Sequence, residues 1–258
     1  MSSNSSSLSD PAPGELPHGS PQDPFEGAGG SPPRRVPVRP AFDPKAQPFV
    51  VNPDGLPAVP EERLAPRALR ERLRHPPAWA PEPRELAWRD GDTPPRPASV
   101  LVPLVLRPAG VHVMLTQRTA HLNHHAGQVS FPGGRVEATD ASEADTALRE
   151  TEEETGLSRD LVEMIGRLPD YLTSSGFRIA PMIGLVRPAF SLAPDPFEVA
   201  AVFEVPLRFL MDPANHRVHS VALPHNGQRV YYSMPWNDYF IWGATAGMLR
   251  DLYRLLSA

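Results

Sequence analysis

Residues 131–134 read Phe-Pro-Gly-Gly, and residues 147–157 read Ala-Leu-Arg-Glu-Thr-Glu-Glu-Glu-Thr-Gly-Leu. Residues 139–155 are predicted to form a helix, with Asp140 as a candidate N-cap and Gly156 ending it. This helix places Glu150, Glu153 and Glu154 at positions i, i+3 and i+4, on one face. Like charges at this spacing repel by roughly tenths of a kcal/mol per pair, so the arrangement lowers stability unless a cation lies among them. Mg2+ and Mn2+ prefer such oxygen ligands and keep other positions for water and substrate phosphates.

A solvated acidic helix face is the simpler interpretation of three glutamates, and the preceding Phe131–Gly134 segment argues against it. Two adjacent glycines let bare backbone approach a ligand just before the helix begins. We therefore predict Glu150 and Glu154 as metal ligands, because the i, i+4 spacing points both side chains the same way. Glu153 is the predicted third ligand or general base, and the carbonyl of Gly134 is a further candidate ligand.

The segment from Gly134 to Leu157 resembles the Nudix box, Gly-x5-Glu-x7-Arg-Glu-U-x-Glu-Glu-x-Gly-U, in which U is a bulky apolar residue. Thr151 stands at an apolar position, Asp140 stands where the box has Glu, and one extra residue precedes Arg149. The role of that first acidic position thus falls to Asp140 or to nearby Glu137. Arg149 belongs to the predicted catalytic set, either by binding phosphate or, as the resemblance implies, by pairing with a box carboxylate.

A second motif lies upstream, in Leu115-Thr116-Gln117-Arg118-Thr119 and in Leu122 through Gly127-Gln128-Val129-Ser130-Phe131-Pro132-Gly133-Gly134. This combination resembles the coenzyme A pyrophosphatase branch of the Nudix hydrolases. The resemblance implies Mg2+- or Mn2+-dependent cleavage of coenzyme A or its thioesters to 4'-phosphopantetheine species and adenosine 3',5'-bisphosphate. Two alternatives remain: a pyrophosphatase for another nucleoside diphosphate derivative such as ADP-ribose or NADH, and a non-catalytic Nudix binding or regulatory protein.

The predicted substrate-binding residues are Arg118, His125, Gln128 and Glu198. Arg118 ends a predicted strand and is either a phosphate ligand, with the 3'-phosphate of coenzyme A as a candidate, or an exposed arginine. Glu198, in the Pro194–Glu198 loop, is an alternative general base to Glu150 and Glu153. His121, His124 and His125 lie on a loop without the i, i+4 spacing of a helical zinc site, and His125 is instead expected to shape the substrate pocket.

Composition excludes several classes of protein. The formal net charge of -5 argues against nucleic-acid binding, and the absence of cysteine excludes disulfides and thiolate catalysis. No apolar run approaches the ~18 residues of a membrane span. The first 20 residues lack both a basic start and an apolar core, so we expect a cytoplasmic protein.

Residues 1–45 combine proline, serine and glycine with almost no aliphatic residues, which predicts a disordered arm. Residues 46–96 are predicted to be a partly ordered extension with a short helix between Pro66 and Pro76. Residues 97–258 form the predicted Nudix hydrolase domain, with the box at about 134–157. Apolar runs of strand length lie at residues 99–106, 111–115, 163–168, 179–186, 199–205, 217–223 and 229–234, and further helices are predicted at 207–211 and 243–256. These mixed elements predict an α+β fold, and the resemblance implies a Nudix α/β/α sandwich with a mixed β-sheet.

Overall fold

The strand β2 (Arg96–Arg107) organises the core, and its residues Ala98–Val105 are buried without interruption. Continuous burial is typical of a central strand covered on both faces. The computed structural model describes residues 42–83, 93–121, 127–223 and 227–258. Asp43–Ala258 form one compact unit, whereas the predicted disordered arm lies outside the described residues except for positions 42–45.

Within the described residues β2 belongs to a sheet of eight strands. The others are β3 (Gly110–Arg118), β4 (Val129–Ser130), β5 (Gly133–Arg135), β6 (Val162–Arg167), β7 (Tyr171–Leu172), β8 (Phe177–Val186) and β9 (Val199–Pro206). β2 pairs antiparallel with β3 as a hairpin and parallel with β8, so the sheet is mixed, as predicted. A second, antiparallel sheet has the order β1-β10-β11-β12, with β1 (Phe49–Val51), β10 (Arg217–Leu223), β11 (Gly227–Trp236) and β12 (Tyr239–Trp242).

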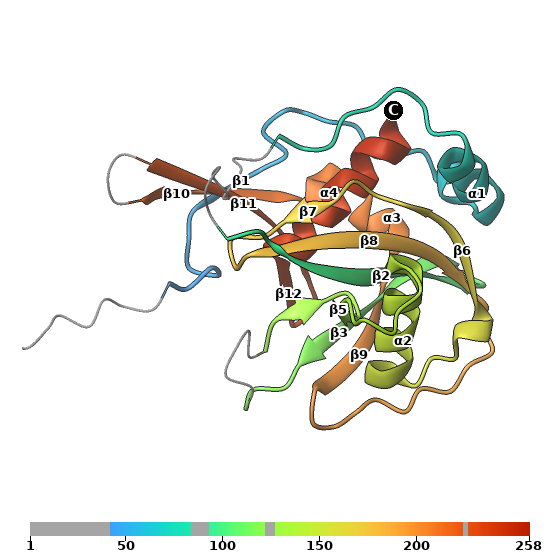
Figure 1. Ribbon diagram of the computed structural model, residues 1–258. Helices are drawn as coiled ribbons and strands as arrows, with labels where there is room; N and C mark the ends of the chain where they lie inside the picture. The colour runs from blue at the N-terminus through green and yellow to red at the C-terminus, as the bar shows by residue number, and fades with distance from the viewer. Residues whose placement is uncertain (1–41, 84–92, 122–126, 224–226) are drawn as a thin grey trace, which may run out of the picture. The chain divides into compact units, whose positions relative to one another are not determined.

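Helices cover both faces of the mixed sheet, which confirms the predicted sandwich (Figure 1). They are α1 (Pro66–Arg74), α2 (Glu143–Thr155), α3 (Leu207–Leu210) and α4 (Ala244–Ser257), and single 3-10 turns lie at Glu61–Leu64, Arg159–Leu161 and Pro213–Asn215. Val102 and Leu104 of β2 pack in the large core with Leu252 of α4. Val105 and Leu157 share a smaller core at the C-terminal end of α2. None of the helices in the described ranges combines the length and apolarity that a membrane crossing requires.

The box helix begins later than the sequence predicts. Its predicted start was Thr139 with Asp140 as the N-cap, but α2 begins at Glu143 and its cap is Ser142, whose hydroxyl accepts a hydrogen bond from the Asp145 N–H at 3.1 Å. Both residue types cap helices well. Asp140 is unavailable for capping because its carboxylate binds Arg149.

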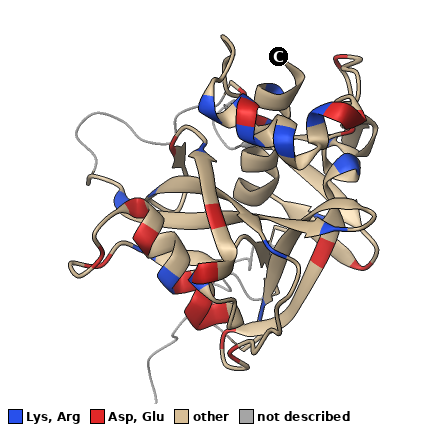
Figure 2. Ribbon diagram, turned by 90° about the vertical axis from the view of Figure 1, so that its right-hand side faces the viewer, with Lys and Arg blue, Asp and Glu red and all other residues tan. Residues whose placement is uncertain are grey.

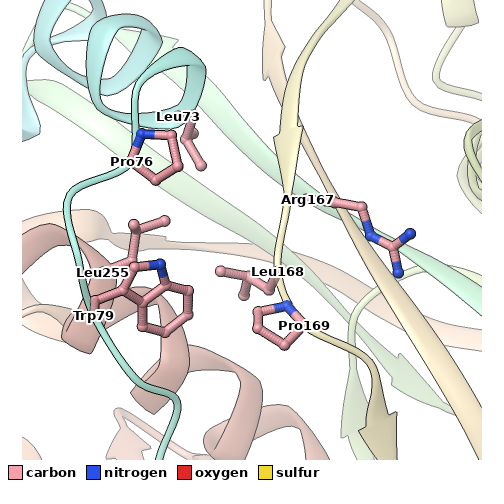
Figure 3. A pocket seen from close by; sticks show the side chains of 7 residues that line it. All are labelled: Leu73, Pro76, Trp79, Arg167, Leu168, Pro169 and Leu255. Carbon is pink, nitrogen blue, oxygen red and sulfur yellow. The ribbon is translucent and has the colours of Figure 1, made fainter.

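The predicted extension packs on the domain, and its predicted helix is α1. Leu69 of α1 is fully buried, and the Arg63 guanidinium donates to the C-terminal carbonyls of α4. An apolar pocket of about 290 Å³ remains where α1 and the following segment meet β6 and α4 (Figure 3). Its lining is Leu73, Pro76, Trp79, Arg167, Leu168, Pro169 and Leu255. The Arg167 guanidinium is already paired with Glu143 and Asp170. The other lining residues are apolar, so we interpret this pocket as a gap in the packing between these elements.

Candidate active site

The three predicted carboxylates of α2 lie in different environments. The Glu154 side chain is 9% exposed, and the Glu153 side chain, one residue earlier, is 60% exposed. Glu150, one turn before Glu154, is intermediate at 19%. In Figure 2 several acidic segments follow one another along this helix. The helix therefore directs Glu154 and Glu150 inward and leaves Glu153 toward solvent.

Gly133 and Gly134 bring bare backbone against these carboxylates. The Gly133 N–H donates a hydrogen bond to Glu154 Oε2 at 3.3 Å. A Cβ on Gly134 would occupy the space of the Glu150 carboxylate, and one on Gly133 would overlap the backbone of β2. Gly133 also has φ +152°, which side-chain-bearing residues rarely adopt. Both positions thus require glycine for the two glutamates to reach the strand.

Burial makes the inner glutamates hard to ionise. It raises the pKa of Glu154 to about 8, against the opposing effects of the Gly133 N–H and of Arg118, while the charges of Glu150 and Glu198 raise it further. Burial also raises the pKa of Glu150, although the Arg149 guanidinium acts in the opposite direction. A buried and a partly buried carboxyl group that both resist ionisation indicate a place that a cation would stabilise.

Arg149 connects the start of the box to its carboxylates. Its Nε lies 2.8 Å from Asp140 Oδ1, and its Nη1 lies 3.1 Å from both Glu150 Oε1 and Glu153 Oε2. Asp140 also accepts hydrogen bonds from the Glu137 N–H and the Thr146 hydroxyl. These contacts, Arg149 foremost, hold the pKa of Asp140 well below its usual value. Asp140 is therefore the carboxylate that pairs with Arg149, and Glu137 contributes its backbone N–H.

Arg118 and Glu198 lie opposite α2. Arg118 Nη1 is 3.9 Å from Glu154 Oε1 and 3.7 Å from Glu198 Oε2. The pairing of β3 with β9 shifts register between Gln117 and Arg118, and such bulges re-aim side chains. Arg118 is thus part of the carboxylate cluster.

The loop that carries Glu198 is hydrogen-bonded both to the residue after β3 and to the end of α2. Thr119, buried just after β3, donates from Oγ1 to the Phe197 carbonyl at 2.8 Å and from its N–H to the Glu198 carbonyl at 3.0 Å. The Asp195 N–H donates to the Glu154 carbonyl at 3.1 Å. A side chain at Gly156 would collide with Ala193 in the same loop. Thr119 belongs to the upstream motif, but the sequence pattern gave it no role of its own.

Gln128 and His125 are the remaining predicted substrate-binding residues. Gln128 lies beside the cluster, because its carbonyl accepts the Arg118 N–H at 3.0 Å. Its side-chain Nε2 lies 3.9 Å from the position that a Cβ on Gly243 would take, next to the start of α4. His125 falls outside the described residues.

The acidic residues fit a divalent cation as an open site. Within the described ranges no three His, Asp or Glu side chains converge as a ready set of ligands. Mg2+ is usually held by one or two carboxylates together with water and substrate phosphates, and Glu150 and Glu154 supply two. Their raised pKa values show that a nearby positive charge would favour the ionised forms.

Comparisons with known proteins identify the family of the chain. The family model described as the NUDIX domain matches residues 95–218. A Salmonella paratyphi B protein described as uncharacterized Nudix hydrolase NudL is 43% identical over 157 residues, 61% of this chain and 81% of that protein. Its Escherichia coli counterpart is 41% identical over the same shares. A solved Caenorhabditis elegans Ap4A hydrolase complex aligns over 43% of this chain and 80% of that chain, at 17% identity and a TM-score of 0.38, too low to add to the assignment. On the family match and these relatives, the chain belongs to the Nudix hydrolases.

Proposed function

We propose that this protein is a divalent-metal-dependent pyrophosphohydrolase that cleaves coenzyme A or its thioesters into 4'-phosphopantetheine species and adenosine 3',5'-bisphosphate. The observation that carries the hydrolase part is the packing of Glu150 and Glu154 against Gly133-Gly134, with Arg118 and Glu198 opposite. A diphosphate needs positive charge on its phosphoryl oxygens, and this cluster combines sites for a cation with a guanidinium.

The residues take the following roles. Glu150 and Glu154 would hold Mg2+ or Mn2+, with the Gly134 carbonyl as a further ligand, and the ion would neutralise phosphoryl charge and acidify a water molecule. Arg149 keeps the Glu150 carboxylate in place through their 3.1 Å ion pair and acts as a positioning residue. Arg118 binds a phosphoryl oxygen from the opposite side. Glu198, with a half-exposed side chain, is the candidate general base, and Glu153 is the alternative.

The upstream motif supports coenzyme A as the substrate. Its two halves lie side by side, because β4 pairs with the end of β3 and the Gln128 carbonyl accepts the Arg118 N–H. The motif therefore forms one structural unit, which borders the carboxylates of α2 and ends in the two glycines. Such a unit is well placed to contact the substrate on both sides of its diphosphate.

A substrate panel tests the proposal. Coenzyme A, an acyl-coenzyme A, ADP-ribose and NADH are offered at equal concentrations with Mg2+ or Mn2+, and cleavage in 18O-labelled water is followed by mass spectrometry. We expect the largest kcat/KM for coenzyme A or its thioester, with label in one phosphate product. Glu150→Gln, which removes a proposed ligand, is the inactive control. A larger kcat/KM for ADP-ribose or NADH would transfer the assignment to that substrate, and no turnover of any compound would indicate a binding protein.

A further inference from the structure

Phe197 is an apolar ring held out into solvent beside the proposed site. It is 64% exposed, more than the other large apolar residues on the described surface. A single exposed apolar side chain is ordinary in itself. Phe197 differs because it directly precedes Glu198, whose carboxylate lies 3.7 Å from Arg118. Its backbone therefore lies next to that of Glu198, at the edge of the cluster that is proposed to bind the diphosphate.

The backbone under this ring is firmly held. The Phe197 N–H donates to Asp195 Oδ1 at 2.8 Å, and its carbonyl accepts the buried Thr119 hydroxyl at 2.8 Å. Further hydrogen bonds join Thr119 to Glu198 and Asp195 to the backbone of α2. A ring on a pre-organised loop binds a flat ligand with little loss of conformational entropy. The loop thus presents Phe197 at a defined position relative to α2.

A second ring stands next to it. The His121 imidazole lies 5.0 Å from the Phe197 ring, centroid to centroid, with the planes inclined by 57°. His121 comes from the turn after β3, three residues beyond Arg118, so both rings are attached to the segments that carry the proposed phosphate contact and base. The tilt leaves Phe197 largely open, as its exposure shows.

We propose that Phe197, flanked by His121, is a stacking platform for the adenine base of the substrate. This inference rests on the proposed function and adds the binding place of one half of the substrate. Coenzyme A has one flat π-system, adenine, whereas the pantetheine arm is a flexible chain without a plane to stack. Stacking of a base on an aromatic side chain changes affinity by about tenfold or more upon alanine substitution.

The test compares AMP with ribose 5-phosphate, which lacks the base, and with 4'-phosphopantetheine, which represents the other half of coenzyme A. Calorimetric titration with AMP, ribose 5-phosphate and 4'-phosphopantetheine is carried out on the wild type, Phe197→Ala and Phe197→Trp. Phe49→Ala is the matched control, because Phe49 is a phenylalanine on β1 that is 44% exposed. We expect Phe197→Ala to weaken AMP about tenfold and to leave the other two ligands unchanged. Phe197→Trp should retain AMP affinity, and Phe49→Ala should behave as the wild type.

Several outcomes would overturn the proposal that Phe197 stacks on the adenine base. These are unchanged AMP affinity in Phe197→Ala, selective loss of 4'-phosphopantetheine, equal loss of all three ligands, or a wild type that binds AMP no better than ribose 5-phosphate. Failure of the proposed function is a separate result. If the enzyme prefers another adenine-containing diphosphate to coenzyme A, the AMP comparison still decides whether Phe197 binds the base.

Discussion

At the scale of single residues, Glu154 stands out because its carboxyl group has a strongly raised pKa. It is a nearly buried carboxylate that contacts a backbone N–H and faces an arginine at 3.9 Å, and its pKa is still raised to about 8, mainly by burial. The two favourable contacts therefore do not offset the loss of hydration. A residue held at this disadvantage is expected where a bound cation restores the charged form.

The stability of the metal-free protein should consequently depend on Glu154. Because its folded pKa of about 8 lies above the ordinary value of 4.5, folding takes up a proton between these values. The stabilisation is complete below about pH 4.5 and is lost as pH rises through 8. In EDTA, the melting temperature of the wild type should fall from pH 6 to 9 more steeply than that of Glu154→Gln. Glu152→Gln, at an exposed ion pair with Arg159, is the control, and parallel profiles for all three would contradict the assignment.

Arg118 is the second residue whose contacts decide a prediction. The structure places its guanidinium beside Glu154 and Glu198, at the proposed diphosphate position. A charge-assisted contact contributes about 1.5–3 kcal/mol, so Arg118→Ala should lower kcat/KM by roughly ten- to a hundredfold. Coenzyme A and dephospho-coenzyme A should lose equally. A loss confined to coenzyme A would instead show that Arg118 binds the 3'-phosphate.

At the scale of elements, the site depends on how the loop before β9 is tied to β3 and α2. Three backbone hydrogen bonds, from Ala193, Asp195 and Thr119, join this loop to the end of α2 and to the residue after β3. Gly156 caps α2 in the left-handed conformation, and its missing side chain leaves room for Ala193. Gly156 therefore both ends α2 and allows the loop to pack against it, and this packing positions Glu198.

Thr119 allows this arrangement to be tested. Thr119→Val keeps the shape but removes the hydroxyl, leaving the Phe197 carbonyl without its 2.8 Å partner, a change of about 1–3 kcal/mol. We expect a lower kcat, because Glu198 is less well placed, with a smaller effect on KM. Thr119→Ser restores the hydroxyl and should recover most of the rate. If the serine variant is as impaired as the valine variant, the methyl contact and not the hydrogen bond is important.

At the scale of the whole described unit, the segment before β2 is part of the core. Glu82 and Arg250 form a buried ion pair, and Arg250 also donates to His216 Nδ1 at 3.1 Å. The opposite nitrogen of His216 lies 2.8 Å from the Leu210 carbonyl, which fits a neutral ring. Burial lowers the pKa of His216 to about 4. The stabilisation from the neutral ring is thus present above pH 6.5 and is lost as pH falls toward 4.

Two truncations should therefore behave differently. A chain that starts at Asp43 keeps the whole compact unit and should retain its melting temperature and kcat. A chain that starts at Thr93 loses the fully buried Leu69 and leaves Arg250 without Glu82. Each loss costs about 2–5 kcal/mol, a large part of a typical stability of about 5–15 kcal/mol. Thermal unfolding followed by circular dichroism measures the stability of both truncated chains, and a hydrolysis assay measures the kcat of the chain that starts at Asp43. An equally stable shorter chain would show that the extension is dispensable.

The sequence by itself identified the parts that depend on local pattern. Hydrophobic patterning located β2, β3, β6, β8 to β11, α1, α2 and α4, because each is long enough for alternation or a helical repeat to be visible. The four-residue α3 lies within the short helix predicted at residues 207–211. The short strands β1, β4, β5, β7 and β12 were not predicted, since strands of two to four residues are defined mainly by their pairing partners. The i, i+4 spacing of Glu150 and Glu154 needed only helix geometry, and the glycine pair was recognisable from composition alone.

Only the tertiary structure decided which of these residues meet. Asp140 and Ser142 are both good N-caps, and the choice between them depends on Arg149, nine residues from Asp140. Arg118 and Glu198 are eighty residues apart in the chain, and their proximity results from the β3–β9 pairing and its bulge. The inward turn of Glu154 requires the backbone of β5. Contacts of this kind are set by how the elements pack, because burial and ion pairing between distant segments leave no periodic signal in either segment.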